Sequence, residues 1–418
     1  SSAHASALVF APFSPHPASN GAHQGACMLM RMVQELGFGL TLASSTLFQD
    51  EPWTGSRKEA FERDFGAKVH VYEPRGSDQA WCSVGFSWRT NFETSRWCPP
   101  GLRAWFEALL EQEAPDLLLV NYAKWAPFAC SDAARGVTKV LQSHDLLSLN
   151  AHLQARLKPH FTSGPYDLAK LSPSVIRQGF FEAIRLQAVE GLEAELAACD
   201  AFDLVIAVSD WEAEVFRQRL APSQVHHLPM VFDARELPNQ HAGPPIFLAA
   251  MNWFNLQGLA FFVQRVLPII LRAAPDFRLR VAGPICRHLL PTHGLELLGF
   301  VDDLDALYAD ARFSICPLLG GTGQQVKVME SMACGVPVVA FEDIALACRL
   351  EDGRQGLVAK GPEDMARACL RLWEDGALAV RLGAQGKAFI RERHSFREAV
   401  HGLELALKSC RRAPRVLA

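Results

Sequence analysis

The chain has 418 residues, of which 49% are hydrophobic and 21% charged, with a formal net charge of −4 and a pI near 6.4. This length exceeds what one hydrophobic core usually supports, so we expect two domains. The apolar content argues against disorder, and the slightly negative charge argues against a nucleic-acid-binding module.

Eleven cysteines lie singly along the chain without a C-x-x-C pair, a pattern typical of buried thiols in a reducing compartment. The longest apolar segment, GLAFFVQRVLPIIL, is interrupted by Gln264 and Arg265 and is shorter than the roughly 20 residues that cross a bilayer. The first residues, SSAHASALVF, lack the charged segment of a signal peptide. We therefore expect a cytoplasmic protein without a membrane-spanning helix.

Short apolar runs alternate with amphipathic helices through the first part of the chain. ALVFAPF predicts a strand, the loop SPHPASNGAHQGA follows, and Met28, Met32 and Leu36 then recur at helical spacing. Further strands are predicted at KVHVYEP, PDLLLVNY, TKVLQSHD and FDLVIAVSD. This alternation predicts a parallel sheet covered by helices on both faces.

The alternation stops near residue 150. RLKPHF and TSGPYD predict an irregular excursion from about Asn150 to Ser174, and a long helix is predicted from about Pro173 to Ala198. A second alternating pattern begins at PPIFLAAMNWFN and ends in the helices PEDMARACLRLWED and 376–394. Between the two patterns, LPMVFDARELPNQHAGPP is rich in proline and polar residues, which is typical of a domain boundary.

A glycine-containing loop and a helix follow the strand FSICP in GGTGQQVKVMESMACGVPVVAF. Gly320, Gly321 and Gly323 allow the backbone to turn and approach a ligand, and the helix start supplies unpaired N–H groups for a phosphate. Lys327 and Glu330 are three residues apart and share one helical face. A cation and a carboxylate there can contact a diphosphate and a ribose diol. The alternative is a surface ion pair on an ordinary helix.

From about Pro245 to Phe396 the order of motifs resembles the C-terminal half of glycosyltransferases of the GT-B fold, in particular the retaining family-four enzymes (glycosyl transferases group 1). The motifs that carry the resemblance are GFVDDLDALYADARFSICPLLGGTG, VKVMESMACGVPVVAF and GRQGLVAKGPEDMARACLRLWED. The resemblance implies an α/β fold with two Rossmann-like domains facing across a cleft. The expected parts are an acceptor-side domain (1–232), a nucleotide-sugar-binding domain (233–395) and a C-terminal helix that crosses back to the first domain (396–418).

The resemblance assigns donor contacts by position. Glu330 matches the family glutamate that binds the nucleotide ribose, and Lys327 lies where related enzymes place a basic group near the diphosphate. The loop expected to wrap the donor sugar and phosphates consists of Thr322, Gly323, Gln324 and Gln325. The family's second glutamate, eight positions before the first, is Thr322 here, so a neutral hydroxyl replaces a carboxylate acceptor for the donor sugar's hydroxyls.

Two further stretches resemble donor contacts in the same half. In AAMNWFNLQGLAFF, Asn252 occupies the turn that touches phosphate in relatives, and Asn255 is expected at the helix cap. In LGFVDD, Phe300 and Val301 lie where relatives hold the nucleotide base. The D-x-D that follows Val301 resembles a metal motif of another glycosyltransferase fold, but we interpret it as a solvated loop and helix start.

In the first half, the loop SPHPASNGAHQG resembles the Gly-containing loop that GT-B enzymes aim into the cleft. Asn20 and Gly21 are its expected donor contacts, and a plain structural turn is the alternative. His144 and Asp145 end a predicted strand at the carboxyl edge, where open α/β sheets bind ligands. Relatives often have a histidine there that contacts the donor sugar, whereas a structural histidine is the alternative. RHSF, residues 393–396, resembles the motif before the family's final helix.

The resemblance implies a hexosyltransferase-type enzyme that moves a sugar from a nucleotide-sugar donor to an acceptor hydroxyl, with retention, in glycan, glycolipid or glycoprotein biosynthesis. Lys327 and the helix N–H groups would stabilise the leaving diphosphate, and His144 is the second expected catalytic residue. No metal or other cofactor is expected. The expected partners are the donor and a glycan, lipid-linked or protein acceptor, and no nucleic acid is expected.

Two alternatives stay open at this point. A GT-B sugar-nucleotide epimerase would need acid and base carboxylates in the cleft, and a non-catalytic sugar-nucleotide-binding protein would be consistent with Thr322. The irregular excursion, which contains Arg156, Lys158 and His160, could contact a membrane surface peripherally or bind an anionic substrate, or it is a solvated loop. A dinucleotide-dependent dehydrogenase is disfavoured because no G-x-G-x-x-G follows the first strand.

Overall fold

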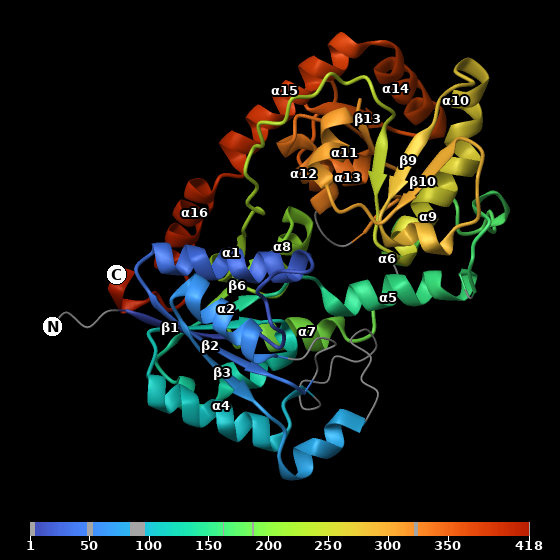
Figure 1. Ribbon diagram of the computed structural model, residues 1–418. Helices are drawn as coiled ribbons and strands as arrows, with labels where there is room; N and C mark the ends of the chain where they lie inside the picture. The colour runs from blue at the N-terminus through green and yellow to red at the C-terminus, as the bar shows by residue number, and fades with distance from the viewer. Residues whose placement is uncertain are drawn as a thin grey trace. The chain divides into compact units, whose positions relative to one another are not determined.

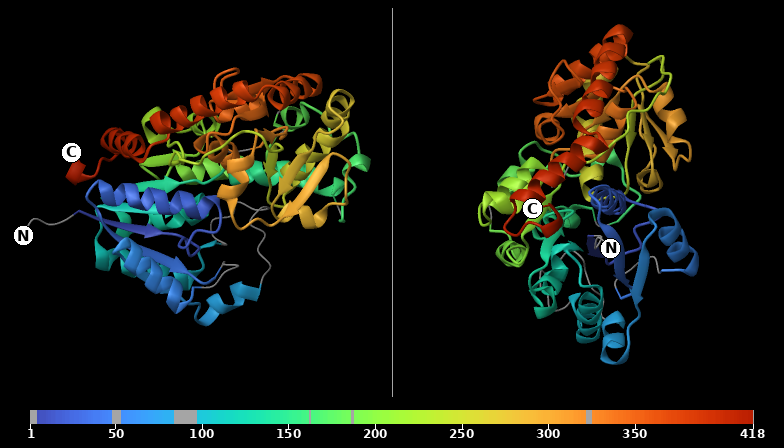
Figure 2. Two further views of the ribbon diagram at one scale, coloured as in Figure 1. Left: turned by 45° about the horizontal axis from the view of Figure 1, so that its top comes forward. Right: turned by 90° about the vertical axis from the view of Figure 1, so that its left-hand side faces the viewer.

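The computed structural model describes residues 5–47, 53–83, 97–161, 163–185, 188–321 and 325–417. It divides into two compact units, each assembled from separate stretches of the chain. Unit 1 comprises residues 1–149, 190–231 and 396–418, and unit 2 comprises residues 150–189 and 232–395. Each unit contains one parallel β-sheet with helices along it (Figures 1 and 2).

The sheet of unit 1 has the strand order β3-β2-β1-β4-β5-β6-β7, and its neighbouring strands pair in parallel. Its strands are β1 (Ser6–Phe10), β2 (Gly39–Ser45), β3 (Lys68–Tyr72), β4 (Leu117–Asn121), β5 (Thr138–Gln142), β6 (Leu204–Ala207) and β7 (Val225–His227). Its helices are α1 (Gly21–Glu35), α2 (Gly55–Phe65), α4 (Pro100–Glu113), α7 (Leu192–Cys199), α8 (Asp210–Arg217) and α16 (Phe396–Ser409), with 3-10 turns η1 (Gly76–Ser83), η2 (Ala123–Cys130), η3 (Asp132–Ala134), η6 (Pro222–Gln224) and η9 (Arg415–Leu417).

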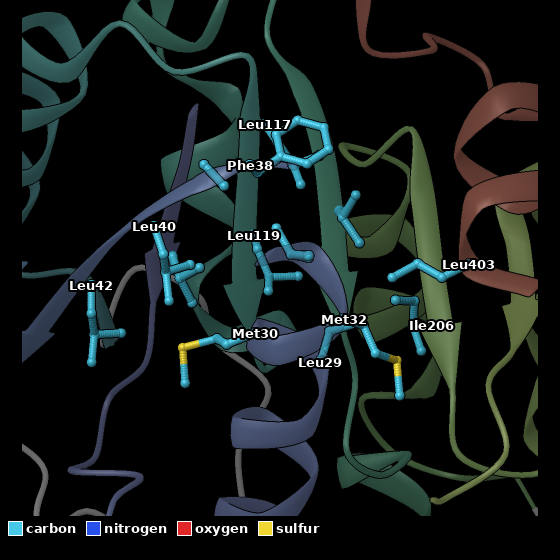
Figure 3. Packing of buried hydrophobic residues seen from close by; sticks show 14 of the residues in the cluster. Leu29, Met30, Met32, Phe38, Leu40, Leu42, Leu117, Leu119, Ile206 and Leu403 are labelled. Carbon is cyan, nitrogen blue, oxygen red and sulfur yellow. The ribbon is translucent and has the colours of Figure 1, made fainter. Parts of the chain in front are cut away.

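Alternate residues of the central strands of unit 1 enter two different cores, as expected for a parallel sheet with two covered faces. On one face, α1 and the C-terminal α16 pack together over the strands, and the cluster is shown in Figure 3. Its labelled members are Leu29, Met30, Met32, Phe38, Leu40, Leu42, Leu117, Leu119, Ile206 and Leu403. On the other face, the Phe10 ring of β1 contacts Phe106 of α4 and Phe128 of η2, with ring centroids 5.7 and 4.7 Å away.

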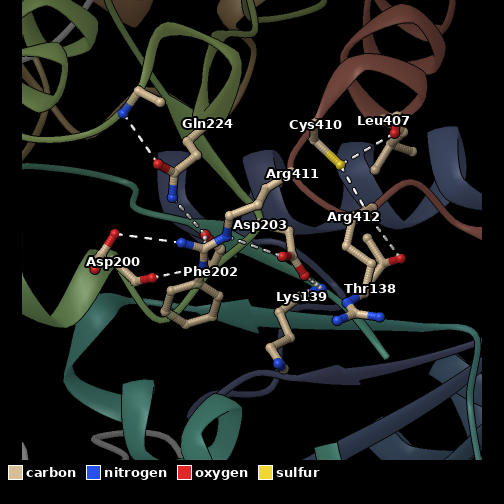
Figure 4. A network of polar contacts seen from close by, with 11 residues as sticks. Thr138, Lys139, Asp200, Phe202, Asp203, Gln224, Leu407, Cys410, Arg411 and Arg412 are labelled. Carbon is tan, nitrogen blue, oxygen red and sulfur yellow. Dashed lines mark hydrogen bonds and ion pairs between the residues drawn. The ribbon is translucent and has the colours of Figure 1, made fainter. Parts of the chain in front are cut away.

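The segment after α16 also makes polar contacts with the rest of unit 1 (Figure 4). The Asp203 carboxylate accepts a hydrogen bond from the backbone N–H of Lys139 at 2.9 Å and pairs with the Arg411 guanidinium at 3.4 Å. Arg411 also donates to the backbone oxygen of Asp200 at 2.8 Å. Because the Asp203 side chain is buried, losing Arg411 would leave a carboxylate without a cation in a poorly solvated place.

The sheet of unit 2 has the order β10-β9-β8-β11-β12-β13, again with parallel pairing. Its strands are β8 (Ile246–Leu248), β9 (Leu279–Ala282), β10 (Leu295–Gly299), β11 (Ser314–Cys316), β12 (Val338–Phe341) and β13 (Gly356–Ala359). Its helices are α6 (Phe180–Arg185), α9 (Trp253–Phe261), η7 (Phe262–Val266), α10 (Leu267–Ala273), α11 (Leu304–Asp310), α12 (Val326–Ala333), α13 (Glu342–Ala347), α14 (Pro362–Glu374) and α15 (Gly376–Arg393), with 3-10 turns η4 (Lys158–His160), η5 (Leu168–Lys170) and η8 (Pro284–His288). Helix α5 (Leu147–Leu157) carries the chain from residues of unit 1 into those of unit 2.

The apolar helix of unit 2 runs from Trp253 to Ala273 and includes the π-helical turn η7. Pro268 has no backbone N–H and its ring crowds the carbonyl four residues earlier, which accounts for an irregular turn just before it. Among the described residues this is the one helix long and apolar enough to cross a membrane, and 61% of its apolar window is buried inside the protein. Gln264 and Arg265 interrupt the apolar run but not the helix, as the sequence predicted. They lie within its π-helical turn.

The segment 150–189 differs most from expectation. The sequence assigned it to the first domain, but it packs with unit 2. The excursion also contains most of helix α5 and the 3-10 turns η4 and η5, and the long helix predicted from Pro173 to Ala198 is wrong. Two shorter helices, α6 and α7, replace it, and Gly179 and Gly191 have positive φ values of 74° and 84°. Glycine adopts this left-handed backbone without strain, and it is not compatible with a continuing helix.

Candidate functional site

In unit 2, the strands that follow β8 in the sequence lie on both sides of it: β9 and β10 on one side, and β11, β12 and β13 on the other. Such a switch point is where parallel α/β sheets bind ligands, beyond the carboxyl ends of the strands. The loops that follow β8 and β11 lead into α9 and α12 respectively. The two stretches that the sequence singled out for phosphate contact therefore begin at adjacent strands of one sheet edge.

Helix α12 begins after Gln325, whose side chain makes no capping hydrogen bond. The Gln325 carbonyl accepts from the N–H groups of Val328 and Met329 at 3.0 and 3.3 Å. The N–H groups of Val326 and Lys327 precede these and have no acceptor in an ideal helix. This end of α12 can thus offer backbone donors to an anion. The predicted contacts Thr322, Gly323 and Gln324 lie outside the described residues.

Lys327 and Glu330 are paired, with 3.0 Å between Lys327 Nζ and Glu330 Oε2. The side chains are 47% and 24% exposed, so both can reach a ligand. The alternative of an i, i+3 ion pair is therefore present in the structure, and it is compatible with a role in binding. Tyr308 of α11, which the sequence analysis did not single out, donates its hydroxyl to the same Glu330 oxygen at 3.3 Å. Burial and the Glu330 charge raise the pKa of Tyr308, which keeps it a donor.

Asn252 caps α9. Its side-chain oxygen accepts from the N–H of Asn255 at 2.8 Å. The expectation that Asn255 is the cap is wrong: Asn255 lies inside the helix and donates to the Ala250 carbonyl at 2.9 Å. The three-residue spacing between the two asparagines suits a cap at the first of them, which is the rule that locates this helix start.

The two residues expected at the nucleotide base follow β10. Phe300 is 73% exposed, while Val301 is half-buried against a cluster that includes Ile246 and Tyr308. An aromatic ring this exposed at a strand's carboxyl end is available for stacking. The interpretation of the D-x-D as a loop and helix start is confirmed, since Asp303 caps α11 by accepting from Ala306 N at 3.0 Å and Asp305 pairs with Arg235.

In unit 1 the corresponding switch point lies between β1 and β4. The loop after β1 ends at Asn20, which caps α1 by accepting from the N–H of His23 at 3.0 Å. Gly21 is the first residue of the helix and is exposed. The structural role that the sequence left as the alternative for this turn is therefore present. Its capping oxygen is occupied, so any ligand contact by Asn20 would come from the rest of its side chain or its backbone.

His144 follows β5 and is held by Asn121 at the end of β4. Asn121, which is fully buried, donates through Nδ2 to the Phe10 carbonyl at 2.9 Å. Its oxygen must then face the imidazole, so His144 Nε2 carries the proton of the 2.7 Å contact. Burial, with a smaller effect of His23, lowers the pKa of His144 to about 3. The ring is therefore neutral at pH 7, with Nδ1 as its hydrogen-bond acceptor.

Aromatic residues surround His144 that sequence reasoning did not identify. Tyr122 lies 4.6 Å from the imidazole centroid, and Phe13 stacks on His23 with 4.5 Å between centroids. Tyr122 and His144 have positive φ values of 70° and 60°. Such backbone strain in non-glycine residues is concentrated at functional sites. The signal available in the sequence was the polar NY after an apolar strand, at the same edge as SHD.

Buried carboxylates lie behind this loop. Glu195 accepts from the N–H groups of Leu147 and Ser148, each at 2.9 Å, and Glu212 accepts from Leu146 N at 2.9 Å. Both side chains are almost fully buried, and burial raises the pKa of Glu195 to about 7. Burial, and after it the charge of Asp145, raises the pKa of Glu212 as well. These carboxyl groups hold the start of α5, so they are positioned for structure and do not resemble the exposed acid and base that an epimerase needs.

Within the described ranges, no group of three or more His, Cys, Asp and Glu side chains is placed to hold a metal ion. The ten cysteines described there are all free thiols, and nine of them are buried or half-buried. Burial raises the pKa of several of these thiols, for example that of Cys348 to about 12, which keeps them protonated and unreactive.

Two parallel sheets, each with helices along it and one switch point, give this chain the fold of the GT-B glycosyltransferase structures. Residues 245–375 match the model of the family "Glycosyl transferases group 1". The resemblance seen in the sequence is thereby confirmed for this part of unit 2, and the α/β fold with two Rossmann-like domains is confirmed as well. No curated protein sequence matches the chain.

Solved structures share the fold along almost the whole chain. HepE of Anabaena in complex with UDP-glucose is 16% identical with a TM-score of 0.62, covering 97% of this chain and 100% of that one. Sucrose-phosphate synthase of Thermosynechococcus elongatus is 14% identical with a TM-score of 0.60, covering 96% and 98%. A glycosyltransferase of Rickettsia africae is 12% identical with a TM-score of 0.61, covering 97% and 98%.

Proposed function

We propose that this protein is a glycosyltransferase that moves a sugar from a nucleotide-sugar donor to an acceptor hydroxyl. The observation that carries the proposal is the arrangement at the carboxyl edge of unit 2. An exposed aromatic residue, Phe300, an uncapped helix start at Gln325, and the accessible pair Lys327 and Glu330 follow strands of one sheet. HepE, whose fold this chain shares, binds UDP-glucose, which supports a nucleoside diphosphate sugar as the donor class.

Each group has a chemical role in this proposal. The α12 N–H groups and the Lys327 ammonium stabilise the negative charge that develops on the leaving diphosphate. Binding draws Lys327 away from Glu330, whose carboxylate then accepts from the ribose hydroxyls while Tyr308 keeps it oriented. The neutral His144 contributes Nδ1 as an acceptor for a sugar hydroxyl. We further propose retention of configuration, a catalytic cycle without a metal or other cofactor, and a cytoplasmic location, peripheral at the inner membrane face where the acceptor is lipid-linked.

The test has two stages. Thermal unfolding is first measured with UDP, GDP, dTDP and CMP, because a ligand that binds only the folded state raises its stability. Nucleotide-sugars of the stabilising nucleotide are then incubated with glycan, lipid-linked and peptide acceptors, and free nucleotide and sugar product are measured. A glycosylated product supports the proposal. An epimerised donor identifies an epimerase, and tight binding without turnover identifies a binding protein.

The site assignment has its own control. Lys327→Met and Glu330→Gln should weaken nucleotide binding, whereas Lys408→Met, which removes the cation of an exposed helical ion pair with Glu404 in unit 1, should not. If no nucleotide stabilises the protein and the two unit 2 variants behave as wild type, the donor site lies elsewhere.

A further inference from the structure

The loop that leads from β11 to α12 begins against a segment from much earlier in the chain. Gly320 faces Phe181 of α6, and a Cβ atom at Gly320 would lie only 2.6 Å from Phe181 Cδ2 and 3.2 Å from its Cγ. Side chains do not approach this closely, so the absence of a Cβ is what allows the contact. Phe181 is 2% exposed and is therefore fully committed to this packing.

Phe181 also packs against another element of the site, helix α9. Its ring lies 5.5 Å from that of Phe254, in the first turn of α9. Phe254 in turn packs against the cluster that contains Leu318 of the loop and Met329 of α12. A continuous apolar path thus joins α6 to the start of the loop and to the helix that carries the proposed diphosphate contacts.

The segment before Phe181 is anchored to unit 2 by glutamine side chains that bind its backbone. Gln257 of α9 is fully buried and donates to the Val175 carbonyl at 2.8 Å. Gln264, in the π-helical turn, donates to the carbonyls of Leu168 and Leu171 at 2.8 and 3.0 Å. Gln257 and Gln264 are seven residues apart, which places them on one side of the helix. The segment that precedes Phe181 is therefore held in place by hydrogen bonds to this helix.

We propose that Phe181 is a positioning residue for donor binding: its ring fixes the backbone at Gly320 and Gly321, where the loop toward the α12 helix start begins. The inference rests on the proposed donor site at α12. Residues 150–189 contain no proposed donor contact. In this proposal they hold the loop of unit 2 that leads to the diphosphate contacts. The expected signature is a change in donor affinity caused by a residue that does not touch the donor.

Steady-state kinetics separate positioning from general stability. Phe181→Ala should raise the KM for the donor about tenfold while changing kcat less than about threefold, and Phe181→Leu should restore most of the affinity. Phe277→Ala is the matched control: Phe277 is also 2% exposed and makes a ring contact, 5.0 Å from Trp373, but it precedes β9 at the opposite, amino end of the sheet. It should destabilise the protein without changing the donor KM.

A second variant tests the contact from its other side. Gly320→Ala alone should weaken donor binding about tenfold, because the new methyl group displaces the Phe181 ring. In the double variant with Phe181→Ala, the space left by the ring accommodates the methyl group, so Gly320→Ala should cost less than about twofold more. Gly376→Ala, whose Cβ would meet nothing within 4 Å, is the glycine control. Fully additive losses in the double variant would overturn the contact as the cause.

Hydrogen exchange gives a readout that needs no nucleotide. Phe181→Ala should speed exchange in peptides covering Leu318 to Gly321 and the start of α12, and Phe277→Ala should not. Unchanged exchange together with an unchanged donor KM refutes the inference. If the wild-type protein binds no nucleotide, the proposed function is wrong, and the exchange rates still decide whether Phe181 fixes this loop.

Discussion

Replacing Glu330 by glutamine separates a binding carboxylate from a surface ion pair. The change removes the charge but keeps the size and an oxygen for the Tyr308 hydroxyl, which now lies 3.3 Å away. Lys327 and Glu330 are 47% and 24% exposed, and a pair of this kind contributes only about 0.2–0.5 kcal/mol to stability. For a unit of this size that corresponds to a fall in Tm of roughly 0.4–2 °C.

The expected effect on ligand affinity is much larger. Hydrogen bonds to a charged acceptor contribute about 1.5–3 kcal/mol each, and glutamine keeps a weaker, neutral acceptor in the same place. Glu330→Gln should therefore weaken nucleoside diphosphate binding roughly 10–100-fold. A large loss of affinity with almost unchanged stability is not expected of an ordinary surface pair.

The assay is titration calorimetry with the stabilising nucleotide, accompanied by thermal unfolding without ligand. Glu107→Gln is the matched control, since Glu107 pairs with Arg103 on α4 at 3.1 Å with exposures of 35% and 46%. It should lower Tm as slightly as Glu330→Gln and leave affinity unchanged. An affinity of the Glu330 variant within twofold of wild type would refute the assignment of Glu330 to the ribose.

Three further predictions concern the sheets and their edges. Asn121→Asp places a carboxylate 2.7 Å from His144, so the pKa of this histidine should rise from about 3 to above 6, as measured by NMR titration of the ring. At Gly283 the backbone φ is 111°, and a Cβ would lie 2.4 Å from the Ala249 carbonyl oxygen. Gly283→Ala should therefore lower the free energy of unfolding, measured in urea, by about 3 kcal/mol or more. Burial raises the pKa of Glu195 from 4.5 to about 7. Between these pH values the folded state therefore binds more protons than the unfolded state. The stabilising effect of protonated Glu195 is complete below pH 4.5 and is lost as the pH rises through 7. Relative to Glu195→Gln, wild type should thus lose up to about 3 kcal/mol of unfolding free energy between pH 5 and pH 8.

Each of these has an outcome that contradicts it. A histidine that stays neutral at pH 5 in the Asn121 variant would mean that its ring does not face residue 121. A Gly283 variant as stable as wild type would show that the two strands separate easily. Parallel pH curves for wild type and Glu195→Gln would mean that Glu195 is ionised throughout in the folded protein.

Much of the fold follows from local pattern. The apolar runs at Leu117 to Asn121 and Leu204 to Ala207 have both faces covered, and such continuous runs identify central parallel strands from sequence alone. The placement of residues 150–189 could not be predicted in this way. It depends on Gln257 and Gln264, polar residues on an apolar helix, whose partners are backbone carbonyls about 80 and 95 positions away.

The candidate site shows the same division. Lys327 and Glu330 were found because a helix face is a local property. Tyr308 and Asn121 were not, because their roles arise only when strands distant in sequence become neighbours. Asn121 is an example of a buried amide whose two hydrogen bonds, to Phe10 and His144, join β1, β4 and the end of β5. No short window of the sequence contains all three of these positions.

The order in which the chain completes its two units has a consequence for synthesis on the ribosome. Unit 2 closes at residue 395, but unit 1, whose first strand emerges earliest, still lacks α16 at that point. Leu403 and Leu407 are fully buried beside Leu29 and Met32 of α1. Until α16 leaves the exit tunnel, this face of α1 remains open to water and to chaperones. The half of the protein that is begun second is therefore the half that can be finished first.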